Sequence, residues 1–222
     1  SYKLKSRWLS SAKYPRKSPY AMRPAGIVVH NTAGDASATE EAAAMVAGSS
    51  AVSFHVVIDE ETAVECIPFS RNAFHAGDGA QGYANRNLIG IEIARSAEES
   101  GDRFRRAEEN AALYIAHVCV QYGWTSAQLH QHNWYSATEC PHRTKTHWSD
   151  FLAKVDENIS TIKASSEDHP APSAPQVTLI ALGKALDIPA ENRNGTVYAP
   201  VRALCEALGF DVEWKDGEVM IA

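Results

Sequence analysis

Three short segments of branched apolar residues, separated by segments of helical character, constrain the fold of this chain most strongly. The segments "AGIVVHNT" (25–32), "AVSFHVVI" (51–58) and "LIGIEIAR" (88–95) have the composition of buried strands. A predicted helix, "SATEEAAAMVAG" (37–48), begins at a Ser or Thr cap and ends at a glycine, and apolar residues recur at helical spacing over 107–122. Strands that alternate with helices predict a single α/β domain built on one sheet.

A second, smaller region follows a segment rich in Pro, Ser and Ala. Residues 164–176, "ASSEDHPAPSAPQ", show no apolar periodicity and are typical of a linker, which divides the chain into 1–163 and 177–222. In the tail, "YAPVRALCEALGF" (198–210) predicts a helix, and "DVEWKDGEVMIA" (211–222) predicts two strands around a two-residue turn. We therefore expect a small α+β module, and a unit of this size usually packs on a neighbour or on a second copy of itself.

Charge and cysteine content disfavour several classes of function. The net charge of −6 gives no reason to expect nucleic acid as a partner, and no apolar segment has the length of a membrane span. The first 23 residues carry seven Lys or Arg and no acid, which fits either a solvated surface segment or a contact with an anionic wall polymer. No signal-peptide core follows them, so the cytoplasm is the expected compartment. The four cysteines form no CxxC pair, which indicates neither a disulfide framework nor a redox motif.

Candidate metal ligands lie in two parts of the chain. His30 stands where the strand 25–32 meets a loop, the usual place for a site residue on an α/β sheet. His132 and Cys140 lie eight positions apart in "HQHNWYSATECPHR" (130–143), a segment that can fold back so that both side chains converge. Imidazole nitrogen and thiolate are ligands that zinc prefers, but this spacing is no recognised finger motif. The residues alone leave two interpretations open: a metal site, or surface histidines together with a buried thiol.

Five segments, taken in order, resemble the zinc-dependent N-acetylmuramoyl-L-alanine amidases of bacteriophage endolysins, a family that also contains the peptidoglycan recognition proteins of animals. They are "VVHNTAG", "VSFHVVIDE", "IPFSRNAFHAGDG", "NRNLIGIEIARS" and "HQHNWYSATECPHR", and the resemblance covers Ser1 to about Ser160. It implies a central mixed β-sheet flanked by helices, with a zinc ion in a surface groove. It also implies hydrolysis of the amide between N-acetylmuramic acid and L-alanine, with bacterial peptidoglycan as the partner.

Carried over residue by residue, the resemblance implies a zinc ion held by His30, His132 and Cys140. Three protein ligands leave a fourth position, at which a water molecule becomes acidic and a carbonyl is polarised. His130 and His142 match no ligand position of the family. We interpret His130 as a loop residue and His142 as part of the turn into the last helix.

The resemblance also implies which residues move protons and stabilise charge. Glu92, a carboxylate within an apolar strand, matches the catalytic acid/base of similar phage amidases; the alternative is a structural carboxylate paired with Arg95 or Arg71. Many members have lysine where this chain has Thr138, whose hydroxyl offers one neutral hydrogen bond to the oxyanion. Phe54, which replaces the tyrosine of some relatives, has no hydroxyl to donate and is counted only among the substrate contacts.

The glycine-rich loop "NAFHAGDGAQGYANRN" (72–87) is expected to form one wall of the substrate groove, by resemblance. It contains no phosphate-binding pattern, and no helix is expected to start after it. His75 and Asp78 are candidate contacts to the glycan or the stem peptide. The alternative is that the glycines of this loop simply permit a tight turn.

The tail resembles the copper amine oxidase N-terminal-like, or stalk, module of wall-associated bacterial proteins, through "VYAPVRALCEALGFDVEW" (197–214). It has no cluster of His or Met, so copper binding is not implied. We expect residues 177–222 either to bind the cell wall or to form a homodimer.

Together these features predict a phage or prophage endolysin that stays in the host bacterial cytoplasm until it is released to the wall. Two alternatives are open. A non-catalytic peptidoglycan-binding protein typically loses the cysteine ligand, whereas this chain keeps His30, His132 and Cys140. A cytoplasmic amidase that recycles soluble muropeptides needs no wall anchor, and the tail module argues against it.

Overall fold

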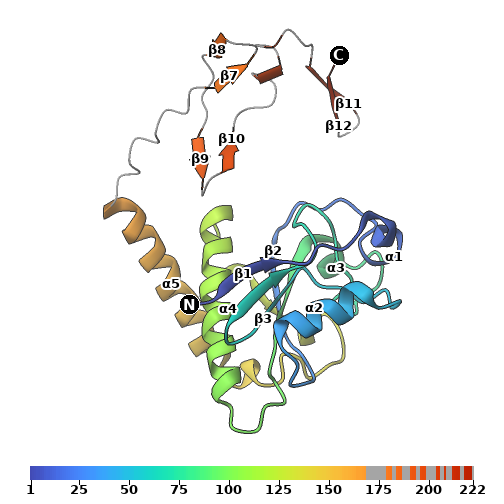
Figure 1. Ribbon diagram of the computed structural model, residues 1–222. Helices are drawn as coiled ribbons and strands as arrows, with labels where there is room; N and C mark the ends of the chain where they lie inside the picture. Colours follow the sequence, from blue (N-terminus) through green and yellow to red (C-terminus); the bar gives the residue numbers. More distant parts are fainter. Residues whose placement is uncertain are drawn as a thin grey trace. The chain divides into compact units, whose positions relative to one another are not determined.

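The computed structural model of the protein describes residues 1–168 and, further along, 179–181, 184–186, 191–193, 196–198, 204–205, 208, 212–215 and 218–221. The chain divides into two compact units, Ser1–Lys163 and Ala164–Ala222. The first unit is built on a six-stranded sheet with the strand order β1-β4-β3-β5-β2-β6 (Figure 1). Its strands are β1 (Lys3–Ser6), β2 (Gly26–Asn31), β3 (Val56–Ile58), β4 (Thr62–Glu65), β5 (Leu88–Ile93) and β6 (Leu129–Gln131).

Neighbouring strands run both parallel and antiparallel, so the sheet is mixed. β2 is parallel to β5 and to β6, β3 is parallel to β5, and β1 is parallel to β4. β3 and β4, which follow each other in sequence, pair antiparallel. The central mixed sheet predicted from the sequence is confirmed.

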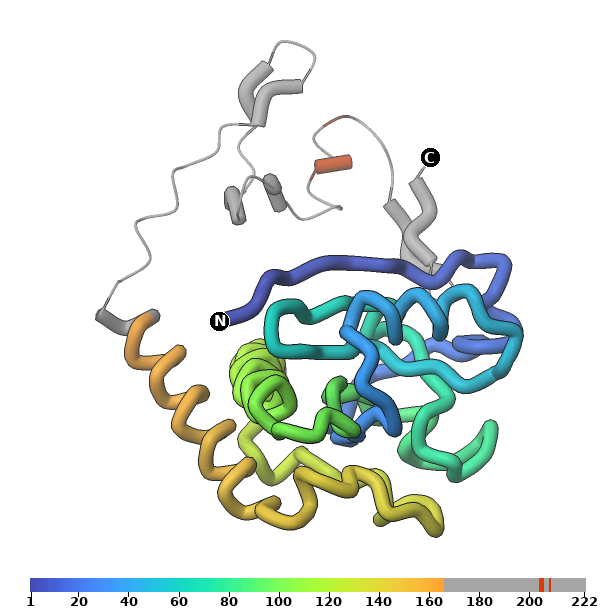
Figure 2. Tube along the Cα trace, turned by 60° about the horizontal axis from the view of Figure 1, so that its bottom comes forward, coloured from blue at the N-terminus to red at the C-terminus, as the bar shows by residue number. Residues whose placement is uncertain are grey.

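Helices cover both faces of this sheet. α4 (Asp102–Tyr122) and α5 (Trp148–Asp168) lie beside each other on one face, and α2 (Ala38–Ala47) packs on the other (Figure 1 and Figure 2). The shorter helical segments of the first unit are η1 (Ser11–Lys13), α1 (Tyr14–Lys17), α3 (Tyr83–Asn87), η2 (Ser126–Gln128), η3 (His132–Trp134) and η4 (Thr144–His147).

Two helices expected from the sequence, α2 and α4, each end at a glycine, which was predicted for α2 alone. The Ser37 hydroxyl accepts from the backbone N–H of Glu40, whose carboxylate accepts from the Ser37 N–H in return, and this capping box begins α2. Gly48 follows the last turn of that helix. α4 stops at Gly123, whose φ of 70° is a left-handed conformation that glycine adopts without strain.

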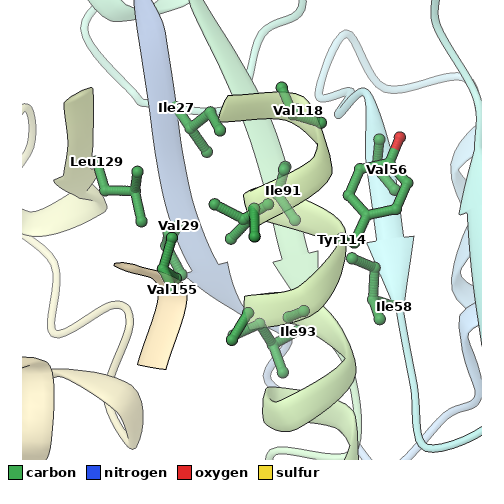
Figure 3. Packing of buried hydrophobic residues seen from close by; sticks show 14 of the residues in the cluster. Ile27, Val29, Val56, Ile58, Ile91, Ile93, Tyr114, Val118, Leu129 and Val155 are labelled. Carbon is green, nitrogen blue, oxygen red and sulfur yellow. The ribbon is translucent and has the colours of Figure 1, made fainter. Parts of the chain in front are cut away.

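Alternation along the strands separates the core from the candidate site. Ile27 and Val29 of β2 and Ile91 of β5 are fully buried in one apolar cluster with residues of α4 and α5 (Figure 3). Each such side chain stabilises the fold by about 1.5–3 kcal/mol, and a slip of one residue would turn the whole set to the wrong face. Successive strand residues point to opposite faces, so His30 and Glu92 lie on the face away from α4. The core therefore fixes the register that places these two side chains.

The strands that the sequence did not reveal are short or lie at the edge of the sheet. All four residues of β1 are exposed, so this edge strand carries no apolar signal. β4 and β6 span four and three residues, which is too short for a periodic pattern. Of the predicted strand 51–58, only Val56–Ile58 is in the sheet.

Some of the basic residues near the start of the chain stabilise the fold through hydrogen bonds to the backbone. The ammonium group of Lys13 donates to the Ala47 carbonyl at 2.8 Å, and that of the buried Lys17 donates to Val52 O at 3.0 Å. The Arg16 guanidinium donates to the carbonyl of Ser49. Lys13 and Arg16 therefore bind backbone oxygens at the end of α2, where the helix dipole favours positive charge, and Lys17 binds the loop that follows.

The second unit contains three described strand pairs. Val212–Lys215 (β11) and Glu218–Ile221 (β12) pair antiparallel with Lys215 opposite Glu218, as the predicted hairpin requires. The other strands are β7 (Leu179–Ala181), β8 (Lys184–Leu186), β9 (Glu191–Arg193) and β10 (Thr196–Tyr198). Residues 164–168, the start of the predicted linker, continue α5, whereas the rest of that linker and most of the tail helix lie outside the described residues. Among the residues that are described, no helix has the length and apolar character that a membrane crossing requires.

Candidate metal centre and active site

One half of the candidate site belongs to the sheet, at the carboxyl ends of two parallel strands. His30 of β2 and Glu92 of β5 are direct partners in the strand register. His30 is 1% exposed and the Glu92 side chain 17%, and 3.9 Å separate His30 Nδ1 from Glu92 Oε1. Such strand ends are the usual location of sites on α/β sheets.

The structure brings His30, His132 and Cys140 together as a group able to hold a metal ion. One ligand atom from each lies within 4.8 Å of the other two. The Nδ1 atoms of the two histidines are 3.1 Å apart, and Cys140 Sγ is 3.9 Å from His30 Nδ1. Tetrahedral zinc with ordinary bond lengths would place two such nitrogens about 3.3 Å apart and a nitrogen and a sulfur about 3.6 Å apart. The donor types and their separations therefore fit a zinc ion.

The other half of the site is a folded-back segment after β6. η3 begins at His132, and the chain returns so that the backbone N–H of Asn133 donates to the Cys140 carbonyl at 2.8 Å. The ring atom His132 Nε2 lies 3.0 Å from Ser136 Oγ, which leaves Nδ1 directed to the other ligands. His132 and Cys140 are both partly exposed, unlike His30.

Asn31, the residue after His30, joins the two halves. Its backbone N–H donates to Cys140 Sγ at 3.3 Å, a contact that favours the thiolate. Its side-chain Oδ1 accepts from the N–H groups of Arg143 and Thr144 at 2.9 and 3.1 Å, and its Nδ2 donates to Thr144 Oγ1 at 3.0 Å. The Thr144 hydroxyl in turn donates to the Glu108 carboxylate of α4 at 2.7 Å. This buried network holds the segment that carries Cys140 against β2.

The acidic groups of the site have raised pKa values because they are buried. Burial first, and the charge of Glu41 second, raise the pKa of Glu92 to about 8. Burial, and then the charge of Glu92, raise the pKa of the Cys140 thiol to about 12. A cation between these groups would favour the thiolate and the carboxylate, which is the coupling expected at a metal site.

The arginines proposed as alternative partners of Glu92 are engaged elsewhere. Arg95 Nε donates to Glu60 Oε2 at 3.0 Å. The Arg71 guanidinium donates to the carbonyl of Ser18 at 2.5 Å through Nη2. Among the described residues, Glu92 is therefore not neutralised by either arginine.

A groove of about 680 Å³ opens over the ligand cluster. Besides the three candidate ligands, its lining includes the predicted residues Glu92, Thr138, Phe54 and His75, but not Asp78. Thr138 Oγ1 accepts from the Cys140 N–H at 3.4 Å, which leaves the hydroxyl proton available to the groove. Phe54 is 7% exposed and packs into the apolar cluster under α2, so it offers the groove one edge of a buried ring.

The loop 72–87 differs from its prediction because it contains the short helix α3. The Asp78 carboxylate accepts from the N–H groups of Ala84 and Asn85 at 2.7 and 3.3 Å, at the start of that helix. Asp78 is a predicted substrate contact, and the structure shows its oxygens holding the backbone of the loop. The strand β5 follows the loop at Leu88, so no helix starts after it, as expected; α3, with five residues and no apolar periodicity, lies within it.

His75, the other predicted substrate contact of this loop, is 6% exposed and hydrogen-bonded through both ring nitrogens. Its Nδ1 lies 3.0 Å from His30 Nε2, and its Nε2 lies 3.0 Å from the Leu88 carbonyl. Burial lowers the pKa of His75 to about 3, so the ring is neutral. Because both ring nitrogens already have hydrogen-bond partners, His75 presents only carbon atoms to a ligand. The contact between His75 and His30 could not be predicted from the sequence.

His130 and His142, which were interpreted as matching no ligand position, are not part of the ligand cluster. His130 is in β6, not in a loop as interpreted, and its Nδ1 lies 2.7 Å from the Tyr135 hydroxyl. His142 is exposed at the rim of the groove. His55 is buried, with Nδ1 accepting from the Gly90 N–H and Nε2 donating to the Arg71 carbonyl, each at 2.9 Å.

Comparison with known proteins identifies the family of the first unit. The family profile described as N-acetylmuramoyl-L-alanine amidase matches residues 20–143. The N-acetylmuramoyl-L-alanine amidase XlyB of Bacillus subtilis is 35% identical over 72% of this chain and 51% of its own length. The N-acetylmuramoyl-L-alanine amidase CwlA of a Bacillus species is 36% identical over 74% of this chain and 66% of its own length. The chain thus spans half to two thirds of the length of these relatives.

Two solved structures share the architecture of the first unit. PlyL superposes with a TM-score of 0.66 at 36% identity, covering 69% of this chain and 97% of that one. The PlyG catalytic domain gives a TM-score of 0.66 at 34% identity, covering 71% and 95%. More distantly, the endolysin PlyTW of Staphylococcus phage Twort is 28% identical over 54% of this chain and 27% of its own length.

Proposed function

Because the chain belongs to the N-acetylmuramoyl-L-alanine amidase family, we propose that it hydrolyses the amide between N-acetylmuramic acid and the L-alanine of the stem peptide. The observation that carries the proposal is the convergence of His30, His132 and Cys140 beside Glu92, under an open groove. Bacterial peptidoglycan is the proposed substrate and partner.

The proposed cofactor is a zinc ion held by His30 Nδ1, His132 Nδ1 and Cys140 Sγ. Two imidazoles and one thiolate form a donor set that zinc prefers, and three protein ligands leave a position open. When bound there, zinc would supply a Lewis acid that activates water and polarises the scissile carbonyl.

Glu92 is proposed to move the protons. It would take a proton from the attacking water and deliver it to the leaving amine of L-alanine. Burial raises its pKa to about 8 before a metal is bound, and a bound cation would lower that value and favour the carboxylate that accepts the proton. The Thr138 hydroxyl, which lines the same groove, would donate one hydrogen bond to the developing oxyanion.

We also propose the biological setting of an endolysin, supported by the phage endolysin among its relatives. The protein would accumulate in the host cytoplasm and act once it is released to the wall. Residues 1–163 would form the catalytic domain, 164–176 a linker, and 177–222 a stalk-like module for wall binding or dimerisation.

Mass spectrometry of digested peptidoglycan tests the proposal directly. Purified walls are incubated with the protein as prepared, after chelation, and after chelation followed by added zinc. We expect new L-alanine amino termini and intact glycan strands in the first and third samples, and no cleavage in the second. Cleavage of the glycan or of another peptide bond would overturn the proposed reaction. Wall binding without any new amino terminus would favour a non-catalytic binding protein.

A further inference from the structure

A chain of hydrogen bonds runs from the candidate metal position into the sheet. His30 Nδ1 faces the other ligands, and His30 Nε2 lies 3.0 Å from His75 Nδ1. His75 Nε2 lies 3.0 Å from the carbonyl oxygen of Leu88, the first residue of β5. The two rings meet nearly edge to face, with an interplanar angle of 87°.

The Leu88 carbonyl, at the end of this series of hydrogen bonds, determines which ring nitrogens carry protons. A carbonyl oxygen only accepts, so His75 must carry its proton on Nε2. His75 is 6% exposed, and its two polar partners, a backbone carbonyl and an imidazole, carry no negative charge that would stabilise a cation. The ring is therefore neutral, so its Nδ1 is a lone pair and can only accept. His30 must then donate from Nε2, and its own Nδ1 is left as a lone pair. That lone pair points at His132 Nδ1 and Cys140 Sγ, 3.1 and 3.9 Å away.

We propose that His75 is a positioning residue, which fixes His30 in the tautomer that can bind a metal through Nδ1. The inference rests on the proposed metal site and assigns no contact with substrate to the nitrogens of His75. Ligand histidines commonly donate their second N–H to an acceptor that orients the ring. Here that acceptor is an imidazole, which the Leu88 carbonyl fixes in turn.

Gly90 provides the space in which this arrangement fits. A Cβ atom at Gly90 would lie 2.5 Å from Cγ of His75 and 2.7 Å from Cδ2, far inside van der Waals contact. The Gly90 N–H and carbonyl are both hydrogen-bonded to His55, which holds this part of β5 in place. The His75 ring therefore lies directly over the backbone of β5, and any side chain at residue 90 would displace it from His30. The close approach of the His75 ring explains why this strand has a glycine at position 90.

The test compares zinc affinity and ring protonation in variants that keep every candidate ligand. His75→Phe keeps a flat ring of similar size but offers His30 no acceptor. His75→Asn keeps an acceptor, since Oδ1 of asparagine takes the place of Nδ1. His117→Phe, on the exposed side of α4, is the matched control. We expect His75→Phe to weaken zinc binding by about 10-fold to 100-fold, and His75→Asn to recover most of that loss.

A spectroscopic measurement makes the result independent of activity. In the metal-free wild type, ¹⁵N NMR of the imidazoles should show the His30 proton on Nε2, and in His75→Phe a mixture of tautomers. A wild-type His30 with its proton on Nδ1 would overturn the inference, even if the variants failed to fold. Folded His75→Phe that binds zinc like the wild type would overturn it as well. A wild type that binds no zinc at all would instead contradict the proposed metal site.

Discussion

The two halves of the candidate site are built differently. His30 and Glu92 come from adjacent buried strands, and their relative position follows from the register that the apolar core imposes. His132 and Cys140 come from one irregular segment, are partly exposed, and are held by side-chain hydrogen bonds. The apolar packing that stabilises the fold therefore also holds the strand half of the site rigid. The segment half depends on a few polar contacts, both within the segment and to β2.

The largest effects are expected when the ligand histidine of each half is replaced in turn and the two variants are compared. His30→Ala and His132→Ala should both abolish zinc binding and hydrolysis, because each removes one of three ligands. His30→Ala also leaves a buried void and unpaired partners, so it should lower the free energy of unfolding of the metal-free protein by about 2–4 kcal/mol. His132→Ala should lower it by less than about 1 kcal/mol. Denaturant unfolding with chelator present measures both, and equal losses would show that the halves do not differ in rigidity.

A second prediction changes the chemistry of the strand half without changing its shape. Glu92→Gln keeps the size and polarity of the side chain but cannot move a proton. We expect zinc affinity within a few-fold of wild type and a loss of about 10²- to 10⁴-fold in the rate of amide hydrolysis. Zinc titration and turnover of a soluble muropeptide measure the two quantities. Normal turnover in Glu92→Gln would require another proton acceptor.

A third prediction uses the acid sensitivity of the buried histidines behind the site. Burial lowers the pKa of His55 to about 4, below the ordinary value of 6.5 that applies to the unfolded chain. The unfolded state therefore binds the proton first, so the stability that His55 contributes is present above pH 6.5 and is lost as the pH falls towards 4. The loss amounts to about 3 kcal/mol at most.

His55→Asn removes this titration while its Oδ1 can still accept from the Gly90 N–H. Its free energy of unfolding should be lower than that of wild type at neutral pH, because the bond to the Arg71 carbonyl changes, but it should fall less steeply between pH 6.5 and 4. His117→Asn, at an exposed position of α4, is the control and should follow the wild-type slope. Parallel curves for wild type and His55→Asn would contradict the assignment of a neutral buried ring.

The difference between the halves also explains what the sequence could predict. Branched apolar residues marked β2 and β5, and His30 and Glu92 were conspicuous as polar residues at or within them. The strand half of the site was thus accessible from periodicity and position. His132 and Cys140 were only two of several polar residues in an irregular segment, and the resemblance to a family singled them out.

The contacts that support the ligands could hardly be predicted from the sequence. His75 reaches His30 across 45 positions, and Asn31 reaches Thr144 across 113, so neither pair could be recognised from local spacing. Gly90 offered one signal, since a glycine inside a buried strand often marks a close approach by another group. Side-chain hydrogen bonds between distant residues depend on the whole fold, and the sequence pattern does not encode them locally.

The smallest expected effect tests the link between the halves. Asn31→Ala removes no ligand and leaves the N–H that donates to Cys140 Sγ, but it deprives the buried N–H groups of Arg143 and Thr144 of their acceptor. The segment that carries Cys140 should then move away from β2, and zinc affinity should fall by about 10-fold to 100-fold while His30 stays in place. Thr144→Ser, which keeps the hydroxyl between Asn31 and Glu108, should bind zinc nearly as well as wild type. Unchanged affinity in Asn31→Ala would mean that the segment holds its shape without β2, and the two halves would then be independent.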